Sequence, residues 1–141
     1  DNTYKGLGDL VKHVSDSRII SIETLDYPFE WVEPLIREFK TCVCIDAGHQ
    51  IKYGYNLDKT FERYQKETAI IHLHGVDFSS EYVKDHTSLD KLPEEKFIQI
   101  KMILEKFTGV VSLEVFNLEN LNNSLAVLSK CFQNISPGIK K

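Results

Sequence analysis

The stretch Thr41-Cys42-Val43-Cys44-Ile45-Asp46 decides the fold, because it is short, apolar and closed by a carboxylate. Three other stretches share this form and end on a carboxylate or an imidazole: residues 18–23, 69–74 and 109–114. Each stretch is followed by a turn and then by a segment with helical spacing, which predicts four strand–helix units. Because strands that alternate with helices form parallel sheets with right-handed crossovers, the sequence predicts an α/β fold.

The predicted helices lie over residues 29–39, 57–64, 93–107 and 118–132, and one further helix, over residues 4–14, precedes the first strand. Asn56 and Asp58 compete as the N-cap of the helix over 57–64. A loop over residues 53–55 leads to that helix, and residues 75–92 are expected to form a long polar loop. We predict no antiparallel hairpin anywhere in the chain.

The charged ends of the four strands are expected to meet at one edge of the sheet. Side chains alternate along a strand, so Val43 and Ile45 share an apolar face while Cys44 and Asp46 share the other face. The same alternation adds three residues to the polar face: Glu23, His72 and Glu114. Carboxylates and imidazole suit a divalent ion such as Zn²⁺ or Mn²⁺, which predicts a metal site. Taken singly, each residue also fits a structural role, such as a solvated strand end or a turn cap.

Four strand–helix units form either half of an eight-stranded (β/α)8 barrel or a small open sheet. An open doubly wound sheet would bury the acids and the histidine under helices at an energetic cost, whereas a barrel keeps them at a solvent-filled mouth. We therefore predict a single half-barrel domain over residues 1–141. Four strands leave two open edges, so we expect a fragment of a longer barrel, or a sheet closed by a second copy or a companion chain.

Composition excludes several classes of partner and setting. The net charge of −4 and the pI of about 5.7 are not those of a typical nucleic-acid binder. No apolar run reaches the length of a membrane span, so no membrane partner is expected. Three cysteines, an odd number, do not form a disulfide framework, which favours a reducing, cytoplasmic setting.

The sequence resembles the xylose-isomerase-like barrels, a superfamily that includes sugar isomerases, epimerases and endonuclease-IV-like phosphodiesterases. The matching stretches are Ile22-Glu23-Thr24, Asp46-x-x-His49, His72-Leu73 and Leu113-Glu114. They occur in the order of the last four strands of that barrel, so the resemblance implies its C-terminal half. It also implies that the four strand-end residues bind a divalent metal, and that His49 binds a second metal or contacts substrate.

Two further segments resemble the phosphodiesterase branch of this superfamily. One is Asp-Ala-Gly-His-x-x-x-x-Gly-Tyr-Asn-Leu over residues 46–57, and the other is Asp85-His86-Thr87-Ser88-Leu89, which is one residue shorter than the pattern of the branch. By this resemblance Asp85 and His86 complete a cluster of more than one metal. Over residues 41–116 the chain is most similar to the cobamide-remodelling phosphodiesterases, which implies a corrinoid-like phosphoester as the substrate and hydrolysis in its nucleotide loop.

In a phosphodiesterase of this kind Glu114 is expected to bridge or orient the nucleophilic water, and His49 is the second candidate catalytic residue. We expect three further residues to contact the substrate: His74, Tyr53 and Tyr55. A partly exposed place at a loop edge is the alternative for His74, and packing within a lid is the alternative for the two tyrosines. The isolated half-barrel is expected to be inactive.

Two other functions remain open at this stage. One is a sugar isomerase or epimerase with a single divalent ion, in which Glu23 and Glu114 move a proton beside a carbonyl. The other is a non-catalytic binding or assembly module that keeps the half-barrel without activity. The number of bound ions separates the first from a phosphodiesterase, and failure to bind any ion favours the second.

Overall fold

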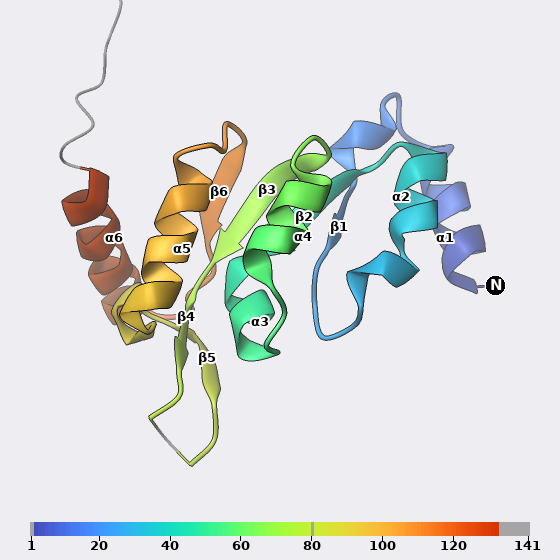
Figure 1. Cartoon of the computed structure of the whole chain (residues 1–141). Coiled ribbons are helices and arrows are strands. Elements are labelled where there is room, and N and C mark those ends of the chain that lie inside the picture. Colours follow the sequence, from blue (N-terminus) through green and yellow to red (C-terminus); the bar gives the residue numbers. More distant parts are fainter. Residues whose placement is uncertain (1, 80, 133–141) are drawn as a thin grey trace, which may run out of the picture.

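The centre of the computed structural model, which describes residues 2–79 and 81–132, is a parallel sheet (Figure 1). Its four strands lie in the order β1 (Ser21–Glu23), β2 (Cys42–Asp46), β3 (Thr68–Leu73) and β6 (Val110–Leu113). Each strand pairs in parallel with the next, which confirms the predicted parallel α/β arrangement. The outermost residues of the predicted domain, 1 and 133–141, lie outside the described residues.

Helices connect the strands and flank the sheet. The α-helices are α1 (Asn2–Val11), α2 (Glu33–Phe39), α3 (Ala47–Lys52), α4 (Leu57–Tyr64), α5 (Glu94–Leu104) and α6 (Leu118–Phe132). Three short 3-10 helices are η1 (Ser17–Ile19), η2 (Phe29–Trp31) and η3 (Leu89–Lys91). The bounds of α4 and α6 are those predicted, and the side chain of Asn56, not Asp58, caps α4 by accepting a hydrogen bond from Lys59 N–H.

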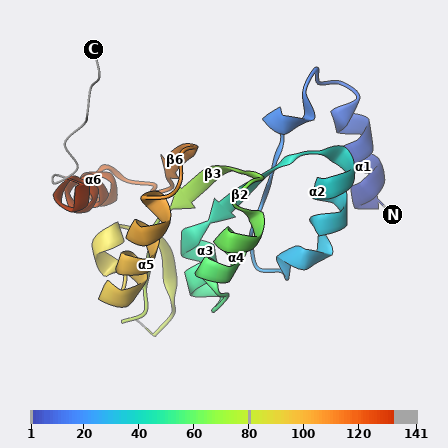
Figure 2. The ribbon, with the colours of Figure 1, turned by 45° about the horizontal axis from the view of Figure 1, so that its top comes forward.

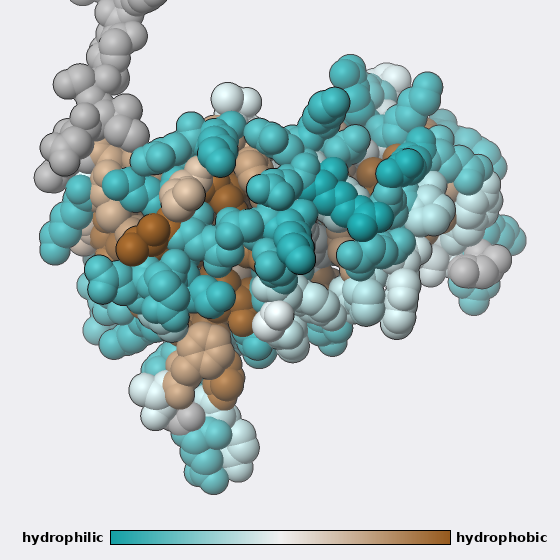
Figure 3. All heavy atoms as spheres, in the orientation of Figure 1, coloured by the Kyte–Doolittle hydropathy of each residue, from teal (hydrophilic) through white to brown (hydrophobic). Residues whose placement is uncertain are grey.

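The core lies between one face of the sheet and the helices. Val43 and Leu73 on the central strands are fully buried, and they belong to one apolar cluster with Phe61 of α4 and Ile100 of α5. Both views of the ribbon place α4 and α5 on the same side of the sheet (Figures 1 and 2). Strands in chain order with helices on one side are compatible with a half-barrel-like arrangement and differ from a doubly wound sheet. The outer surface of this helical layer is mainly hydrophilic (Figure 3).

The prediction of one continuous helix over residues 29–39 is wrong, because the segment forms two separate helices. The chain forms the short η2, turns at Val32, and then begins α2 with Pro34 in its first turn. Proline has a fixed φ and no N–H, so it suits the start of a helix and not its interior. As a result Trp31 does not face the core, and it is 73% exposed.

The prediction that the chain contains no hairpin is also wrong. Residues 75–92 include an antiparallel pair, β4 (Gly75–Asp77) with β5 (Lys84–Thr87), which extends beyond the carboxyl end of β3 (Figure 1). The fully buried Val76 anchors this hairpin to the apolar cluster. A Cβ at Gly75 would overlap the carbonyl of Ser88, so only glycine permits the close return of the chain.

Smaller differences concern the ends of elements. The first helix covers residues 2–11 where 4–14 was predicted, and α5 ends at Leu104, three residues before the predicted end. The segment after β2 is the helix α3 and not a simple turn, because the side chain of Asp46 accepts a hydrogen bond from His49 N–H and caps it. Within the described residues, no helix combines the length and apolar character that a bilayer crossing needs.

Candidate metal centre

The structure brings the four strand-end residues together. Glu23 ends β1, Asp46 ends β2, His72 lies near the end of β3, and Glu114 directly follows β6. The strand register pairs Asp46 with His72, which aligns the ends of the two central strands. One potential ligand atom from each of the four residues lies within 4.8 Å of the others. The predicted convergence at the carboxyl edge of the sheet is therefore present in the geometry.

His72 lies between two carboxylates. Its Nδ1 atom is 2.8 Å from Glu23 Oε1 and 3.0 Å from Glu114 Oε1, and all three side chains are partly exposed. Among the described residues, no lysine or arginine forms an ion pair with either glutamate or with Asp46. Three carboxylates at one point repel one another unless a cation offsets their charge. This donor set suits a divalent ion.

Asp46 is fully buried and connects the sheet to α3. Its carboxylate oxygens lie 3.1 Å from His74 Nε2 and 3.0 Å from His49 Nδ1, and its own N–H donates to Thr24 Oγ1. The two histidine nitrogens and Asp46 Oδ2 form no well-aligned hydrogen bond within the described residues, despite these short distances. Buried polar atoms without a proper partner are costly, so these atoms fit the role of ligands for a bound ion.

Burial and the neighbouring charges have opposite effects on the pKa values of Asp46 and His74. Burial by itself would raise the pKa of Asp46, but the contact with His74 and the N–H of His49 outweigh it and lower that pKa. Burial would likewise lower the pKa of His74, but the carboxylate of Asp46 outweighs it and raises that pKa. Each partner therefore favours the charged form of the other.

Three histidines form a second cluster, on the other side of Asp46. His49 lies on α3, His74 follows β3, and His86 lies on β5. Their ligand atoms lie within 4.8 Å of one another, and the rings of His74 and His86 are 4.1 Å apart between centroids. We refer to these three residues as the histidine cluster. Neutral imidazoles are common ligands of Zn²⁺ and related ions.

Backbone contacts hold the histidine cluster in place. His86 N–H donates to His74 Nδ1 at 3.1 Å, the same Nδ1 lies 3.2 Å from the carbonyl oxygen of Gly75, and Nε2 faces Asp46. His86 has a left-handed backbone with a φ of 50°, and its Nδ1 lies 3.0 Å from the carbonyl oxygen of Glu114. A Cβ at Gly48 would overlap the His74 ring, so glycine is required where α3 approaches this histidine.

The structure pairs Asp85 with a lysine and brings it close to one histidine of the cluster, His49. Its carboxylate is 2.5 Å from Lys52 Nζ and 3.5 Å from His49 Nε2. Burial would raise the pKa of Asp85, but the hydrogen bond and charge of Lys52 outweigh it and lower that pKa. Within the described residues, Asp85 belongs to no group of converging ligand atoms, in contrast to its neighbour His86.

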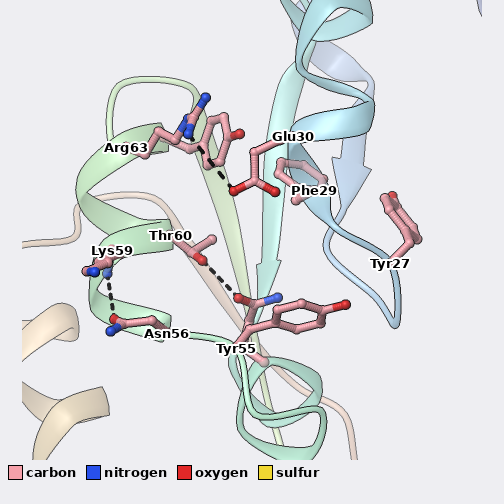
Figure 4. A pocket seen from close by; sticks show the side chains of 10 residues that line it. Tyr27, Phe29, Glu30, Tyr55, Asn56, Lys59, Thr60 and Arg63 are labelled. Atoms are coloured by element: carbon pink, nitrogen blue, oxygen red, sulfur yellow. Dashed lines mark hydrogen bonds and ion pairs between the residues drawn. The ribbon is translucent and has the colours of Figure 1, made fainter.

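The three predicted substrate contacts do not share one surface. His74 is fully buried, which differs from the partly exposed place at a loop edge, and its contact with substrate stays a prediction. Tyr53 is 44% exposed, and its ring lies 5.9 Å from that of His49 and 5.2 Å from Lys52 Nζ. Tyr55 instead lines a separate pocket beside η2 and α4 (Figure 4).

Two residues of the centre were not among the site residues predicted from the sequence. The thiol of Cys44 lies with Glu23 and His72 in a further group of potential ligands, although burial and the nearby carboxylates raise its pKa to about 12. The strand alternation places Cys44 on the polar face and could have identified it. Lys52, which neutralises Asp85, has no comparable signal, because their pairing depends on the position of the hairpin.

The site as a whole contains two adjacent groups of potential metal ligands, and both lie near Asp46. We refer to Glu23, Asp46, His72 and Glu114 as the strand-end set. This set is rich in carboxylates and partly exposed, and the histidine cluster is more enclosed. Comparison with known proteins adds no relative, since no family model, curated protein or solved structure matches the chain.

Proposed function

We propose that this chain provides the metal-binding half of a divalent-metal-dependent phosphodiesterase. The observation that carries the proposal is the convergence of Glu23, Asp46, His72 and Glu114 at the carboxyl ends of four parallel strands. In α/β proteins this end of the sheet is where catalytic groups gather. Three carboxylates meet with one histidine there, and among the described residues no lysine or arginine forms an ion pair with them, which supports a bound cation.

The ion is expected to be Zn²⁺ or Mn²⁺. Glu23, His72 and Glu114 would hold the first ion together with Asp46, and the histidine cluster would hold a second one. When bound, such ions offset the charge of a phosphoryl group and lower the pKa of a coordinated water. The buried nitrogens of His49 and His74 that face Asp46 support a second ion, because they approach its carboxylate without forming a well-aligned hydrogen bond among the described residues.

The residues of the chain would then act on water and substrate. Glu114 is partly exposed and lies at the mouth of the cluster, where its carboxylate can orient a water molecule and accept a proton from it. His49 is mostly enclosed between Asp46 and Asp85, so we infer that it serves as a metal ligand more readily than as a proton donor to a leaving group.

The substrate class rests on the sequence resemblance alone. The first substrate to test is a cobamide, whose nucleotide loop contains a phosphoester, and bis(4-nitrophenyl) phosphate serves as a general phosphodiester. Strands β1 and β6 are the edges of the sheet, and Val110 and Val111 on β6 are exposed. We therefore propose that a companion half-barrel or a second copy completes the substrate pocket, and that the chain alone hydrolyses little or nothing.

A sugar isomerase or epimerase with one ion is the second candidate. One observation favours it: the carboxylate of Asp85 is ion-paired with Lys52 and does not join the histidine cluster. The strand-end set alone would then hold the single ion. The two proposals differ in the number of ions bound. In both, the same strand-end residues hold the first ion.

Elemental analysis of the chain after loading with Zn²⁺ or Mn²⁺ tests both candidates. Two ions per chain are expected for the phosphodiesterase, one ion favours the isomerase, and none contradicts both. Glu23→Gln should weaken the first ion by about 100-fold or more, since changes to outer-shell partners already cost about 10–100-fold. Glu105→Gln makes the same chemical change at an exposed position outside the cluster and should leave binding unchanged.

A further inference from the structure

A separate pocket of about 220 Å³ opens between η2 and the segment formed by α3 and α4 (Figure 4). The loop after β1 forms one wall, with Tyr27 and Phe29, and α4 forms the opposite wall, with Lys59 and Arg63 (Figure 4). Within the described residues, none of the side chains that line it belongs to the strand-end set or to the histidine cluster. Its volume is below the range of sites for drug-sized ligands, so it suits a small molecule.

Aromatic rings line this pocket and are fixed by their own contacts. Phe29 is buried, and its ring meets that of Tyr64 edge to face, with centroids 5.1 Å apart. The hydroxyl of Tyr27 donates to the carbonyl oxygen of Glu23 at 2.7 Å, which holds the loop against β1. Tyr55 adds a further ring at the base of the pocket (Figure 4). Rigid aromatic walls favour a flat apolar body, because stacked and edge-to-face contacts add to the gain from burial.

One buried polar group in the pocket has an unused donor. Gln50 is 2% exposed, and its Oε1 accepts a hydrogen bond from Thr60 Oγ1 at 2.9 Å. No described residue accepts a hydrogen bond from its Nε2, although the residue lines the pocket. This nitrogen is not among the fully buried unpaired atoms of the described residues, so it can donate to water or to a ligand in the pocket. The pocket therefore presents a donor in a fixed position.

The charges at the rim favour an anion. Arg63 is shared between Glu33 and Glu30, with 3.9 Å between Arg63 Nη1 and Glu30 Oε1. Lys59 lines the pocket and forms no ion pair with any described residue, so its charge is available. A ligand that carries an acid group can meet this ammonium, while its ring lies against the aromatic walls.

We propose that this pocket binds a small planar aromatic acid, at a site distinct from the candidate metal centre. The ring contacts Tyr27, Phe29 and Tyr55, a polar atom on the ligand accepts a hydrogen bond from Gln50 Nε2, and the acid group pairs with Lys59. The acid group supplies the counter-ion that Lys59 lacks among the described residues, and the ring fills a space that is too small for a dinucleotide.

Calorimetric titration of the whole chain with 2-naphthoate tests the proposal. The expected dissociation constant is about 1 mM or tighter, from the usual efficiency of small ligands. The neutral 2-naphthamide should bind about tenfold more weakly, because it lacks the charge that pairs with Lys59. Binding should not depend on added Zn²⁺, which separates this site from the metal centre.

Two variants and one control localise the binding. Lys59→Met should weaken 2-naphthoate about tenfold, while Lys66→Met removes the same charge at an exposed position outside the pocket and should change nothing. Gln50→Leu should weaken both naphthalene ligands, and a thermal melt shows whether this buried variant stays folded. Absence of saturable binding up to about 10 mM, or equal affinity for the wild type and Lys59→Met, would overturn the proposal.

Discussion

The strand-end set includes Asp46 and the histidine cluster contacts Asp46, but the two groups are held in different ways. Glu23, His72 and Glu114 come from three strands whose positions are fixed by the hydrogen bonds of the sheet. His49, His74 and His86 come from a short helix, a strand end and a hairpin. The first set depends on the register of the sheet, and the second depends on local contacts. The histidine cluster can therefore be disrupted while the strand-end set is kept.

Gly48→Ala is expected to have the largest effect on stability and on metal binding. The new methyl group would overlap the His74 ring, so α3 must move and the histidine cluster with it. Overpacking of this kind costs about 3 kcal/mol of unfolding free energy. We expect a lower melting temperature by circular dichroism and the loss of one bound ion per chain, with the other ion retained.

Gly6→Ala is the matched control for this change. Gly6 lies on α1, and a Cβ there meets nothing within 4 Å. Alanine is favoured over glycine inside a helix, so this variant should be as stable as the wild type or more stable by about 0.5–1 kcal/mol. If Gly48→Ala behaved in the same way, the described packing of α3 on His74 would be wrong.

His86→Ala should have an intermediate effect that is confined to one set. His86 is partly buried, and its ring contacts His74 and Phe116, so its removal should cost about 1–2 kcal/mol of unfolding free energy. The second ion should be lost and the first should keep its affinity, as measured by calorimetric titration with Zn²⁺. Equal weakening of both ions would show that the two sets act as a single unit.

The smallest expected effect is a dependence of the stability of the metal-free chain on pH. The pKa of His74 is raised in the folded state by Asp46, so its stabilising charge is fully present below the pKa of free histidine and is lost as the pH rises through the folded value. The metal-free protein should therefore be less stable to urea at pH 9 than at pH 6. His74→Gln should reduce this difference in stability between the two pH values. If the difference stayed the same, groups other than His74 would cause it.

The carboxyl edge of the sheet was predictable because two simple rules control it. Alternation along a strand determines the face of Glu23 and His72, and parallel pairing brings the ends of neighbouring strands to one edge. Neither rule requires knowledge of contacts that are distant in the sequence. The apolar positions Val43 and Leu73 followed from the same alternation, and both are fully buried as expected.

The histidine cluster could not be predicted in the same way. His86 approaches His74 only because residues 75–77 and 84–87 pair as a hairpin, and their sequence has neither a two-residue turn signal nor alternating apolar residues. The exposure of Trp31, in contrast to the histidine cluster, could have been predicted, because the sequence contains a local signal for it. Pro34 begins a new helix, and that break turns the side chain of Trp31 away from the core.

The exposed place of Trp31 has a practical consequence for spectroscopy. It is the only tryptophan of the chain, and its indole ring is already largely in contact with water in the folded protein. Its emission should therefore be red-shifted before unfolding and should change little when the chain unfolds. Tryptophan emission is therefore a poor probe of global unfolding for this chain, and circular dichroism is the better measurement.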